Sequence, residues 1–416
     1  MLDRYRRLSL GTKILVFLAL GIAAGLALGE RAALAEPLGD LFIRLLMMAA
    51  IPLVFFNLLA AISGMTDVGL LGRLGVKILI YYTLTSLVAV ALGLALASWL
   101  RPGDGVTLSE TPPEALGDIP SIADVLLDLV PTNVVAAFAE GRVGQVVVFA
   151  VILGIASLML PAAKRERLDP LFQSAAELFR ALVSLVLRFA PIGIGALAAT
   201  TVGRYGPGLF GPLARFIGSV YLGLAAMVLL YMALLYFLAR TSPLWFFRKT
   251  GPLYATTAAT CSSLASLAVS LELAEKRLEL PRAVYSFTLP LGAQINKDGT
   301  AVMLSAILLF TAQASGIELD PGTMASVLVI GLVLSEGSSG IPGGGLVTSL
   351  LFVQAFGLPL EVAAIVGGIY RLIDVGNTTV NCMGDVVGTI LVARSEGWRP
   401  PPLAAGSGVE VYPDAS

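Results

Sequence analysis

The sequence predicts an all-α protein that crosses a membrane several times. Hydrophobic residues make up 57% of its 416 residues and charged residues only 13%, whereas an ordinary soluble domain carries about 25% charged residues. The apolar residues form long unbroken runs rather than the ~10-residue alternating segments of an outer-membrane barrel. Runs of this length are typical of transmembrane helices.

Charge and composition exclude several classes of function. The net charge is −1 with no basic domain, so nucleic acid is not expected as a partner. The absence of histidine removes imidazole metal sites and Ser-His-Asp catalysis. Cys261 and Cys382 are too few for a disulfide framework or a four-thiolate zinc site. No nucleophile–base pair is visible, so we expect neither an enzyme nor an organic cofactor.

Six apolar runs before residue 240 predict membrane helices, at roughly 12–29, 40–63, 74–99, 143–161, 170–202 and 210–239. The fifth run exceeds the ~20 residues that cross a bilayer, so it must tilt or protrude. The basic N-terminus resembles the start of a signal peptide, but we interpret it as the beginning of a retained first helix. Residues 101–121 are polar and proline-rich and predict an extramembrane loop.

Beyond residue 240 the apolar segments are shorter and are interrupted by Gly, Pro, Ser and Asn, at 243–275, 283–312, 322–356 and 360–394. Interrupted segments of this kind indicate a transporter binding site. The distribution of Lys and Arg places both termini on the cytoplasmic side of a plasma (inner) membrane. This orientation requires the first and third of these segments to return to the side that they entered from. We therefore expect two re-entrant hairpins, one from each face.

The last predicted span carries a stripe of polar residues on one helical face. Tyr370, Asp374, Asn377, Asn381 and Asp385 follow one another at spacings of 4, 3, 4 and 4 residues. Carboxylates at membrane depth are costly and usually mark a substrate or ion path. The alternative is a buried polar seam that only holds helices together.

A second group of candidate residues lies in the segment 286–302. Pro290, Gly292 and Gly299 are expected to break the helix and to free backbone carbonyls for a cation. Asn296 and Asp298 supply the hard oxygen ligands that a small cation prefers. The alternative is a proline kink with polar residues that face solvent.

Three weaker signals accompany these groups. The hairpin tips TCSSLAS (260–266) and SEGSSGIPGGG (335–345) let backbone approach a ligand closely, although such sequences are usually ordinary loops. Tyr82, Thr85 and Ser86 place three hydroxyls on one face of the third predicted helix.

These stretches together resemble the dicarboxylate/amino acid:cation symporter family, the glutamate transporter homologues. The resemblance spans about 12–395 and rests on FIRLLMMAAIPLVF, YYTLTS, LVPTN, YSFTLPLGAQINKDGT, GSSGIPGGG and DVGNTTVNCMGD. It implies eight transmembrane helices, two opposed hairpins, a homotrimer and an elevator mechanism. In that arrangement, helices 1, 2, 4 and 5 of residues 1–239 form the scaffold, while helices 3 and 6 move with a transport domain at 240–395. Residues 396–416 would form a cytoplasmic tail.

The resemblance also implies a substrate site. Asp374 resembles the acid that holds a substrate ammonium, and Asn381 resembles the amide that binds the α-carboxylate. Thr300 and Ser263 lie where a hydroxyl and the hairpin backbone touch substrate in the family. The full set of expected substrate-binding residues is Ser262, Ser263, Thr300, Gly343, Asp374, Asn377, Thr378 and Asn381.

Two cation sites follow from the same resemblance, with Na⁺ as the expected coupling ion and H⁺ as the alternative. The first consists of the Asp385 carboxylate with carbonyls of Gly292, Asn296 and Asn381. The second, deeper site consists of Tyr82, Thr85, Ser86, Asn296 and Asp298.

The sequence departs from the family where a substrate side chain would bind. Members that carry acidic amino acids have an arginine where this chain has Asn377, and Cys261 and Val375 stand where a further arginine is usual. Without such a guanidinium we expect a neutral, polar amino acid as substrate, unless Arg371 turns inward. The alternatives are a proton-coupled symporter of acidic amino acids or dicarboxylates and, more remotely, an ion channel.

A further departure is the lysine in NKDGT, where the family has methionine. We expect the Lys297 ammonium to lie close to the carbonyls of the second hairpin, or to bind Glu336, and so to replace one coupling ion. The alternative is that Lys297 points away or pairs with Asp298 or Asp385, while Glu336 faces water.

Overall fold

The computed structural model describes residues 10–64, 68–106, 127, 130–140, 142–338 and 343–400. All regular elements in these ranges are helices. Before residue 240 they are α2 (Leu10–Leu28), the 3-10 helix η1 (Gly29–Ala35), α3 (Glu36–Ser63), α4 (Val68–Leu100), α6 (Val134–Ala139), α7 (Val143–Leu158), α8 (Ala162–Leu187), α9 (Ala190–Tyr205), the 3-10 helix η2 (Gly206–Leu209) and α10 (Phe210–Phe237).

The second half contains two pairs of consecutive helices that pack against each other, α11 with α12 and α15 with α16, at the positions of the predicted hairpins. Its elements are α11 (Pro243–Thr260), α12 (Ser263–Glu272), the π-helix η3 (Leu273–Arg277), α13 (Arg282–Ile295), α14 (Asp298–Ala314), α15 (Pro321–Gly337), α16 (Gly344–Ala355) and α17 (Leu360–Ser395). The chain turns between α11 and α12 at Cys261, which has a left-handed backbone. Residues 339–342 of the second tip lie outside the described residues.

Two predicted elements differ from the structure for identifiable reasons. The fifth run is two helices, α8 and α9, because Pro191 near the start of α9 has no amide hydrogen to donate to the Leu187 carbonyl, where α8 ends. The break in the segment 283–312 lies at Asn296 and Lys297, whereas Pro290 stays inside α13. The short helix α6 was not predicted, and of the polar loop 101–121 only residues 101–106 are described.

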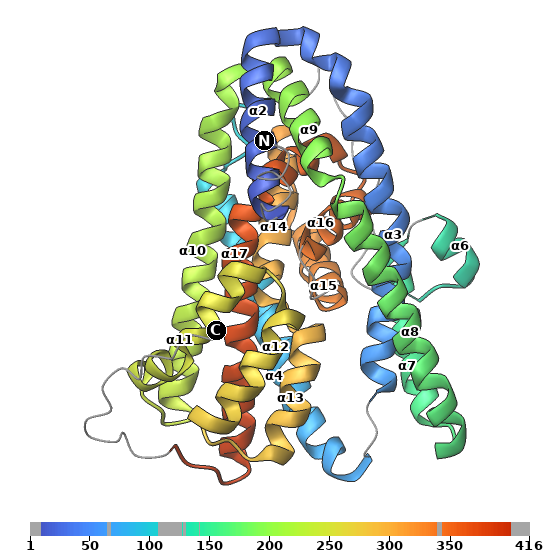
Figure 1. The fold of residues 1–416 in the computed structure, drawn as a ribbon, viewed down its shortest axis with the longest axis vertical. Helices are drawn as coiled ribbons and strands as arrows, with labels where there is room; N and C mark the ends of the chain where they lie inside the picture. The colour runs from blue at the N-terminus through green and yellow to red at the C-terminus, as the bar shows by residue number, and fades with distance from the viewer. Residues whose placement is uncertain are drawn as a thin grey trace, which may run out of the picture.

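The helices pack as two groups (Figure 1). One group contains α2, α3, α7, α8 and α9, with α3 and α8 running side by side along the right of the view. In the other group, α4, α10 and α17 pack around α14, and the two hairpins and α13 complete it. Every residue of α14 except Gln313 is buried, so this helix is the centre of the second group.

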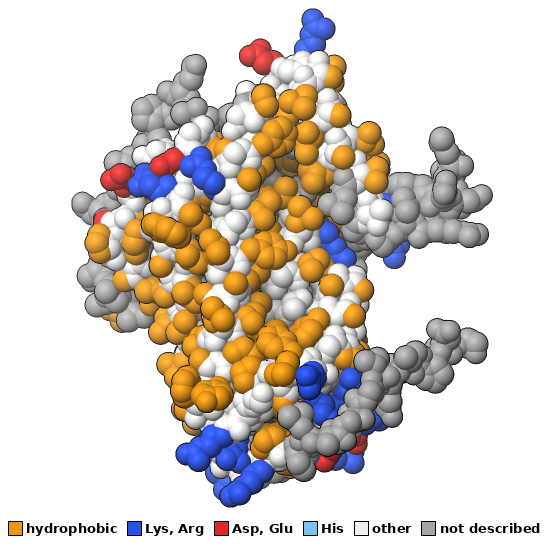
Figure 2. All heavy atoms as spheres, turned by 90° about the vertical axis from the view of Figure 1, so that its left-hand side faces the viewer, with side chains coloured by type: hydrophobic (Ala, Val, Ile, Leu, Met, Phe, Trp, Pro, Cys, Tyr) orange, Lys and Arg blue, Asp and Glu red, His pale blue; other side chains and the backbone are white. Residues whose placement is uncertain are grey.

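The outer surface is that of a membrane protein. Within the described ranges, four stretches are long and apolar enough to cross a bilayer: Thr12–Leu45, Gly72–Leu100, Ala162–Leu187 and Gly206–Phe237. Figure 2 shows the side of the molecule on which α10 lies, where hydrophobic side chains cover most of the surface and Lys and Arg gather at the lower end. Such an apolar surface requires lipid as its solvent.

Glycines set the close approach of α2 and α9. A Cβ atom at Gly21 would lie 2.2 Å from the Gly195 carbonyl oxygen, and one at Gly25 would lie 2.6 Å from the Ala199 carbonyl oxygen. The two α2 glycines are four residues apart in GIAAG, the small-xxx-small pattern that lets membrane helices pack backbone to backbone. The α2–α9 contact therefore depends on the absence of side chains.

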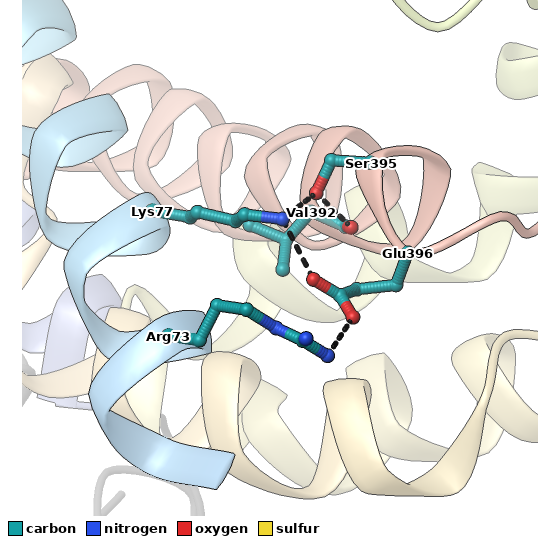
Figure 3. A network of polar contacts seen from close by, with 5 residues as sticks. All are labelled: Arg73, Lys77, Val392, Ser395 and Glu396. Carbon is teal, nitrogen blue, oxygen red and sulfur yellow. Dashed lines mark hydrogen bonds and ion pairs between the residues drawn. The ribbon is translucent and has the colours of Figure 1, made fainter. Parts of the chain in front are cut away.

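An ion-pair network joins α4 to the end of α17 (Figure 3). The Glu396 carboxylate accepts hydrogen bonds from Lys77 Nζ at 2.6 Å and from Arg73 at 2.5 Å, and Lys77 also reaches Ser395 Oγ at 2.9 Å. The hydrogen bond from Lys77 is the main cause that holds the pKa of Glu396 below its usual value of 4.5, and the Arg73 charge adds to it. The network thus fastens the ends of two helices of the second group.

Gly25→Ala should destabilise the α2–α9 contact, because the added methyl group meets backbone. We expect a loss of about 1–3 kcal/mol, measured as a lower thermal unfolding midpoint in detergent. Gly218→Ala in α10 is the matched control, since a Cβ there meets nothing within 4 Å, and it should gain up to about 1 kcal/mol of helix propensity. Equal midpoints for the two variants would contradict the packing argument.

Glu396→Gln should lower the unfolding midpoint at neutral pH in a pH-dependent way. A depressed folded-state pKa stabilises the fold above the unfolded value of 4.5, and this stability is lost as the pH falls through the folded pKa. The difference between the variant and the parent should therefore vanish as the pH falls below about 4.5. Glu272→Gln, which removes only an exposed pair with Lys276, is the control. A difference that persists at low pH would show that the charge is not its cause.

Candidate functional site

A cavity of about 240 Å³ lies where the two helix groups meet, and Asp374 lines it. One wall comes from the hairpin tips and α17, and the other from α2, α3, α8 and α9. The lining residues are Ile14, Phe42, Leu187, Ala190, Ile194, Ala259, Thr260, Gly343, Leu346, Gly367, Tyr370, Arg371 and Asp374. The cavity is therefore apolar apart from a small group of polar and charged side chains on the hairpin and α17 wall.

Asp374 is 6% exposed and is held by donors from two elements. Tyr370, one turn earlier on α17, donates its hydroxyl to Oδ1 at 2.9 Å, and Thr378, one turn later, donates to the same oxygen at 3.5 Å. The Gly343 amide at the start of α16 reaches Oδ2 at 3.5 Å. Asp374, Thr378 and Gly343 thus lie together, as expected, while the contribution of Tyr370 was missed although it belongs to the same polar stripe.

Arg371 brings a positive charge to the same cavity. Its guanidinium donates to the Ala259 carbonyl of the first hairpin at 3.2 Å, and its side chain is half-buried. The side chain therefore turns toward the site and does not simply point into the surroundings. This places a guanidinium and the Asp374 carboxylate on the lining of one cavity.

Asn381 organises the first turn of α14. Its Oδ1 accepts the Gly299 amide hydrogen at 2.7 Å, and its Nδ2 donates to Thr300 Oγ1 at 3.3 Å. Gly299 allows this contact, because a Cβ there would lie 2.5 Å from the Asn377 carbonyl oxygen. The expected pair Asn381 and Thr300 is thus brought together beside the positive end of a helix.

Asn377 does not line the cavity. Its Nδ2 lies 3.2 Å from the Met303 sulfur, and its Oδ1 is buried without a hydrogen-bond partner. The sequence expectation that this amide meets a substrate side chain therefore has no support in the geometry of the cavity.

The two hairpin serines are engaged within the protein. Ser262 caps α12, where its side chain accepts the Ala265 amide hydrogen at 3.1 Å. Ser263 is buried in the first turn of α12. What the first hairpin offers toward the site is the amino end of α12, which attracts anions.

A second polar cluster surrounds Asp298 in the middle of the second group. Ser86 donates to Asp298 Oδ1 at 2.7 Å and Tyr231 donates to Oδ2 at 2.6 Å. Tyr82 and Thr85 are buried beside them, and the Tyr82 hydroxyl donates to the Thr288 carbonyl at 3.0 Å. Tyr231 was missed, because the tyrosines of α10, at 221, 231 and 236, do not fall on one helical face.

Asn296 links this cluster to α17. Its Nδ2 donates to Asp385 Oδ1 at 2.8 Å and to the Asn381 carbonyl at 3.2 Å. Its Oδ1 is buried and has no hydrogen-bond partner. An unpaired amide oxygen, on a residue two positions before Asp298, suits a small, hard cation.

Lys297 lies where no sequence argument placed it. It is 1% exposed, and its Nζ donates to the carbonyls of Ala293 at 2.7 Å, Asn296 at 3.2 Å and Gly292 at 3.5 Å. These three acceptors belong to the end of α13, whereas residues 339–342 of the second hairpin lie outside the described residues. Within the described residues, no ion pair joins Lys297 to Glu336, Asp298 or Asp385 within 4 Å.

The remaining predicted cation ligands also converge. Gly292 faces α4 and α17, because a Cβ there would lie 2.3 Å from the Tyr82 hydroxyl and 2.5 Å from Asp385 Oδ1. Glu336 is half-buried in α15. In the part of the chain that the structure describes, no three His, Cys, Asp or Glu residues gather as a metal site.

The chain is similar to known transport proteins along most of its length. The model of the sodium:dicarboxylate symporter family matches residues 10–395. The chain is 30% identical over 391 residues to a proton/glutamate-aspartate symporter of Bacillus subtilis (92% of this chain, 94% of the relative) and 31% identical over 409 residues to one of Escherichia coli (94% and 93%).

A third relative differs in its named substrate. It is a C4-dicarboxylate transport protein of Brucella anthropi, 32% identical over 395 residues, with 92% of this chain and 88% of the relative covered. All three relatives are named as transporters and none as an enzyme. The family match and the coverage of these relatives lead to one conclusion: this chain belongs to the sodium:dicarboxylate symporter family.

Proposed function

We propose that the protein imports a small acidic amino acid together with a cation. The observation that carries this proposal is the pairing of Asp374 and Arg371 on the lining of one cavity. A buried carboxylate suits the ammonium of an amino acid, and a guanidinium suits a second carboxylate, which it can bind in a bidentate manner. An acidic amino acid carries both groups.

The α-carboxylate would bind where helix ends and amides converge. The Asn381 amide and the Thr300 hydroxyl at the start of α14, with the Ser262 and Ser263 end of α12, supply neutral donors and positive helix ends. Thr378 and Gly343 would keep Asp374 oriented toward the ammonium. Each group of the substrate would then meet a partner of opposite polarity.

The names of the relatives favour acidic substrates, since they include glutamate, aspartate and C4-dicarboxylates. Among these, Asp374 favours the amino acids. A dicarboxylate has no ammonium, so an ionised Asp374 would repel it in a site of low dielectric.

A neutral amino acid is the second candidate. Asn377 favours it, because the amide takes the place of the family's arginine and lies one turn from Asp374 on α17. The cavity lining argues against it, since Asn377 contributes nothing there while Arg371 does.

The coupling cation would bind the Asp298 cluster, with Tyr82, Thr85, Ser86 and Asn296 as the neutral oxygen ligands. A bound Na⁺ would supply the positive charge that a buried carboxylate requires, and H⁺ would neutralise it directly. The names of relatives include proton symporters and a proton/sodium symporter, so both ions are candidates.

The transport cycle would be that of an elevator in a homotrimer. The helices α4 and α10 to α17 would form the moving body, and α2, α3, α7, α8 and α9 the scaffold, which agrees with the two packing groups. The proposed protein crosses the inner membrane with eight helices and carries two opposed hairpins. Both of its termini would lie on the cytoplasmic side. A dedicated channel is the remote alternative, because it would need no site that clamps both charges of a substrate.

Uptake by the purified protein in sealed liposomes should distinguish these substrates. Under an imposed Na⁺ or proton gradient, we expect concentrative uptake of aspartate or glutamate that exceeds uptake of succinate, serine or alanine. Arg371→Gln should lower the preference for acidic over neutral substrates by about 10-fold to 100-fold, since a charged hydrogen bond contributes about 1.5–3 kcal/mol.

The control for that experiment is Arg167→Gln, which removes an exposed charge from the first turns of α8. Concentrative uptake of serine or alanine with no uptake of aspartate would favour the neutral candidate. Equilibration without accumulation under either gradient would point to a channel.

Asp374→Asn should remove substrate binding while it preserves side-chain volume. The ammonium of a bound substrate would then lie buried without its counter-charge, which costs about 3–5 kcal/mol and weakens binding at least about 100-fold. Isothermal titration with aspartate measures this loss. Asp104→Asn at the surface is the control. Unchanged affinity in the Asp374 variant would exclude this residue from the site.

A further inference from the structure

The Lys297 ammonium caps a broken helix inside the protein. Its three acceptors are the carbonyls of Gly292, Ala293 and Asn296, and the side chain is 1% exposed. A lysine that is buried this completely is rare unless its charge is compensated. Here the compensation comes from backbone oxygens at the negative end of α13.

The carbonyls of Ala293 and Asn296 lack a backbone partner because the helix is interrupted, whereas the Gly292 carbonyl also accepts the Asn296 amide hydrogen at 2.9 Å. α13 ends at Ile295, Asn296 has an extended backbone, and α14 begins at Asp298. The last carbonyls of a helix lack partners within it. In transporters with discontinuous helices, such unwound carbonyls and half-helix ends are the groups that coordinate a coupling cation.

All four residues expected to hold the first cation are already engaged. Lys297 binds the carbonyls of Gly292 and Asn296. The Asn296 amide in turn binds the carbonyl of Asn381 and the carboxylate of Asp385. The second expected site differs, because one of its expected ligands, the Asn296 side chain, has a buried amide oxygen without a partner. The first group therefore does not fit an added Na⁺, whereas the second does.

We propose that Lys297 is the resident cation of the Gly292–Asn296–Asp385 site, so that this chain moves one fewer free Na⁺ through that site than a chain with a neutral residue there. The part of this inference that concerns the number of transported Na⁺ ions rests on the proposed function. The ammonium stays attached to α14 through the cycle and needs no ion from solution. The exchangeable cation is then left to the Asp298 cluster.

Lys297→Met is the direct test, because methionine has nearly the same length and volume and carries no charge. Removal of the ammonium should open the carbonyl site to Na⁺. The full-length parent and the variant are purified in high NaCl and then titrated with NaCl at constant ionic strength, with choline as the replacing cation. The readout is the thermal unfolding midpoint without substrate, which rises when Na⁺ binds the folded state.

The proposal requires that the stabilisation of Lys297→Met rises more steeply with log [Na⁺] than that of the parent, by about one additional bound Na⁺. Lys276→Met is the matched control, since it removes an exposed lysine that forms an ion pair with Glu272. Its dependence on Na⁺ should equal that of the parent.

Two results would overturn the proposal. One is a Lys297→Met protein that folds with the parent's dependence on Na⁺. The other is a variant that stays unfolded at every NaCl concentration, because Na⁺ should restore the missing charge. The thermal unfolding midpoint is measured without substrate. Failure of the transport assay with aspartate can therefore be distinguished from failure of this inference.

Discussion

An interrupted helix inside a fully buried layer is the constraint on which the rest of the site depends. The chain leaves helical geometry at Asn296 and Lys297, between α13 and the buried α14. The free carbonyls of one helix and the free amides of the next cannot reach water there, so other groups must satisfy them. Lys297 satisfies the carbonyls and Asn381 satisfies the Gly299 amide. The polar residues around the break are thus required by the break itself.

The two polar regions of the protein meet at one residue. The side chain of Asn381 binds the start of α14, next to the region assigned to the substrate, whereas its carbonyl accepts from Asn296 in the cation region. Asp374 and Asp385 lie on the same face of α17, on either side of it. A shift of α17 or α14 would therefore alter both regions together. This arrangement gives a physical route for coupling between ion and substrate, through direct contact and not over a distance.

Local sequence patterns were sufficient to predict features that depend on one segment of the chain. The stripe from Tyr370 to Asp385 follows from helical periodicity alone, and the distribution of Lys and Arg indicated where the two helix pairs of the second half lie. The position of the break in 283–312 was wrong, because Pro290 is tolerated inside α13 and the interruption comes at Asn296. The position of such a break depends on which side chains of other helices can hydrogen-bond the freed backbone groups. The sequence of the segment itself does not show which side chains these are.

The direction in which a side chain points was the second property that the sequence could not predict. Whether Lys297 faces the second hairpin, an acid or its own helix depends on the positions of α13, α15 and α17 relative to one another. In the same way, Tyr231 becomes part of the Asp298 cluster only because α10 packs beside α14. Arg371 was recognised as a residue that could turn inward, but only the cavity between the two helix groups decides that it does.

The attached ammonium also has an electrical consequence. A charge that is part of the protein crosses the membrane field with the loaded carrier and returns with the empty one, so its net displacement over a cycle is zero. A free Na⁺ crosses once and is released, and each such charge contributes about 2.3 kcal/mol per 100 mV of membrane potential. A carrier that holds Lys297 in place of an ion therefore draws less of its driving force from voltage. It accumulates its substrate less steeply, and it keeps working in a cell whose membrane is partly depolarised.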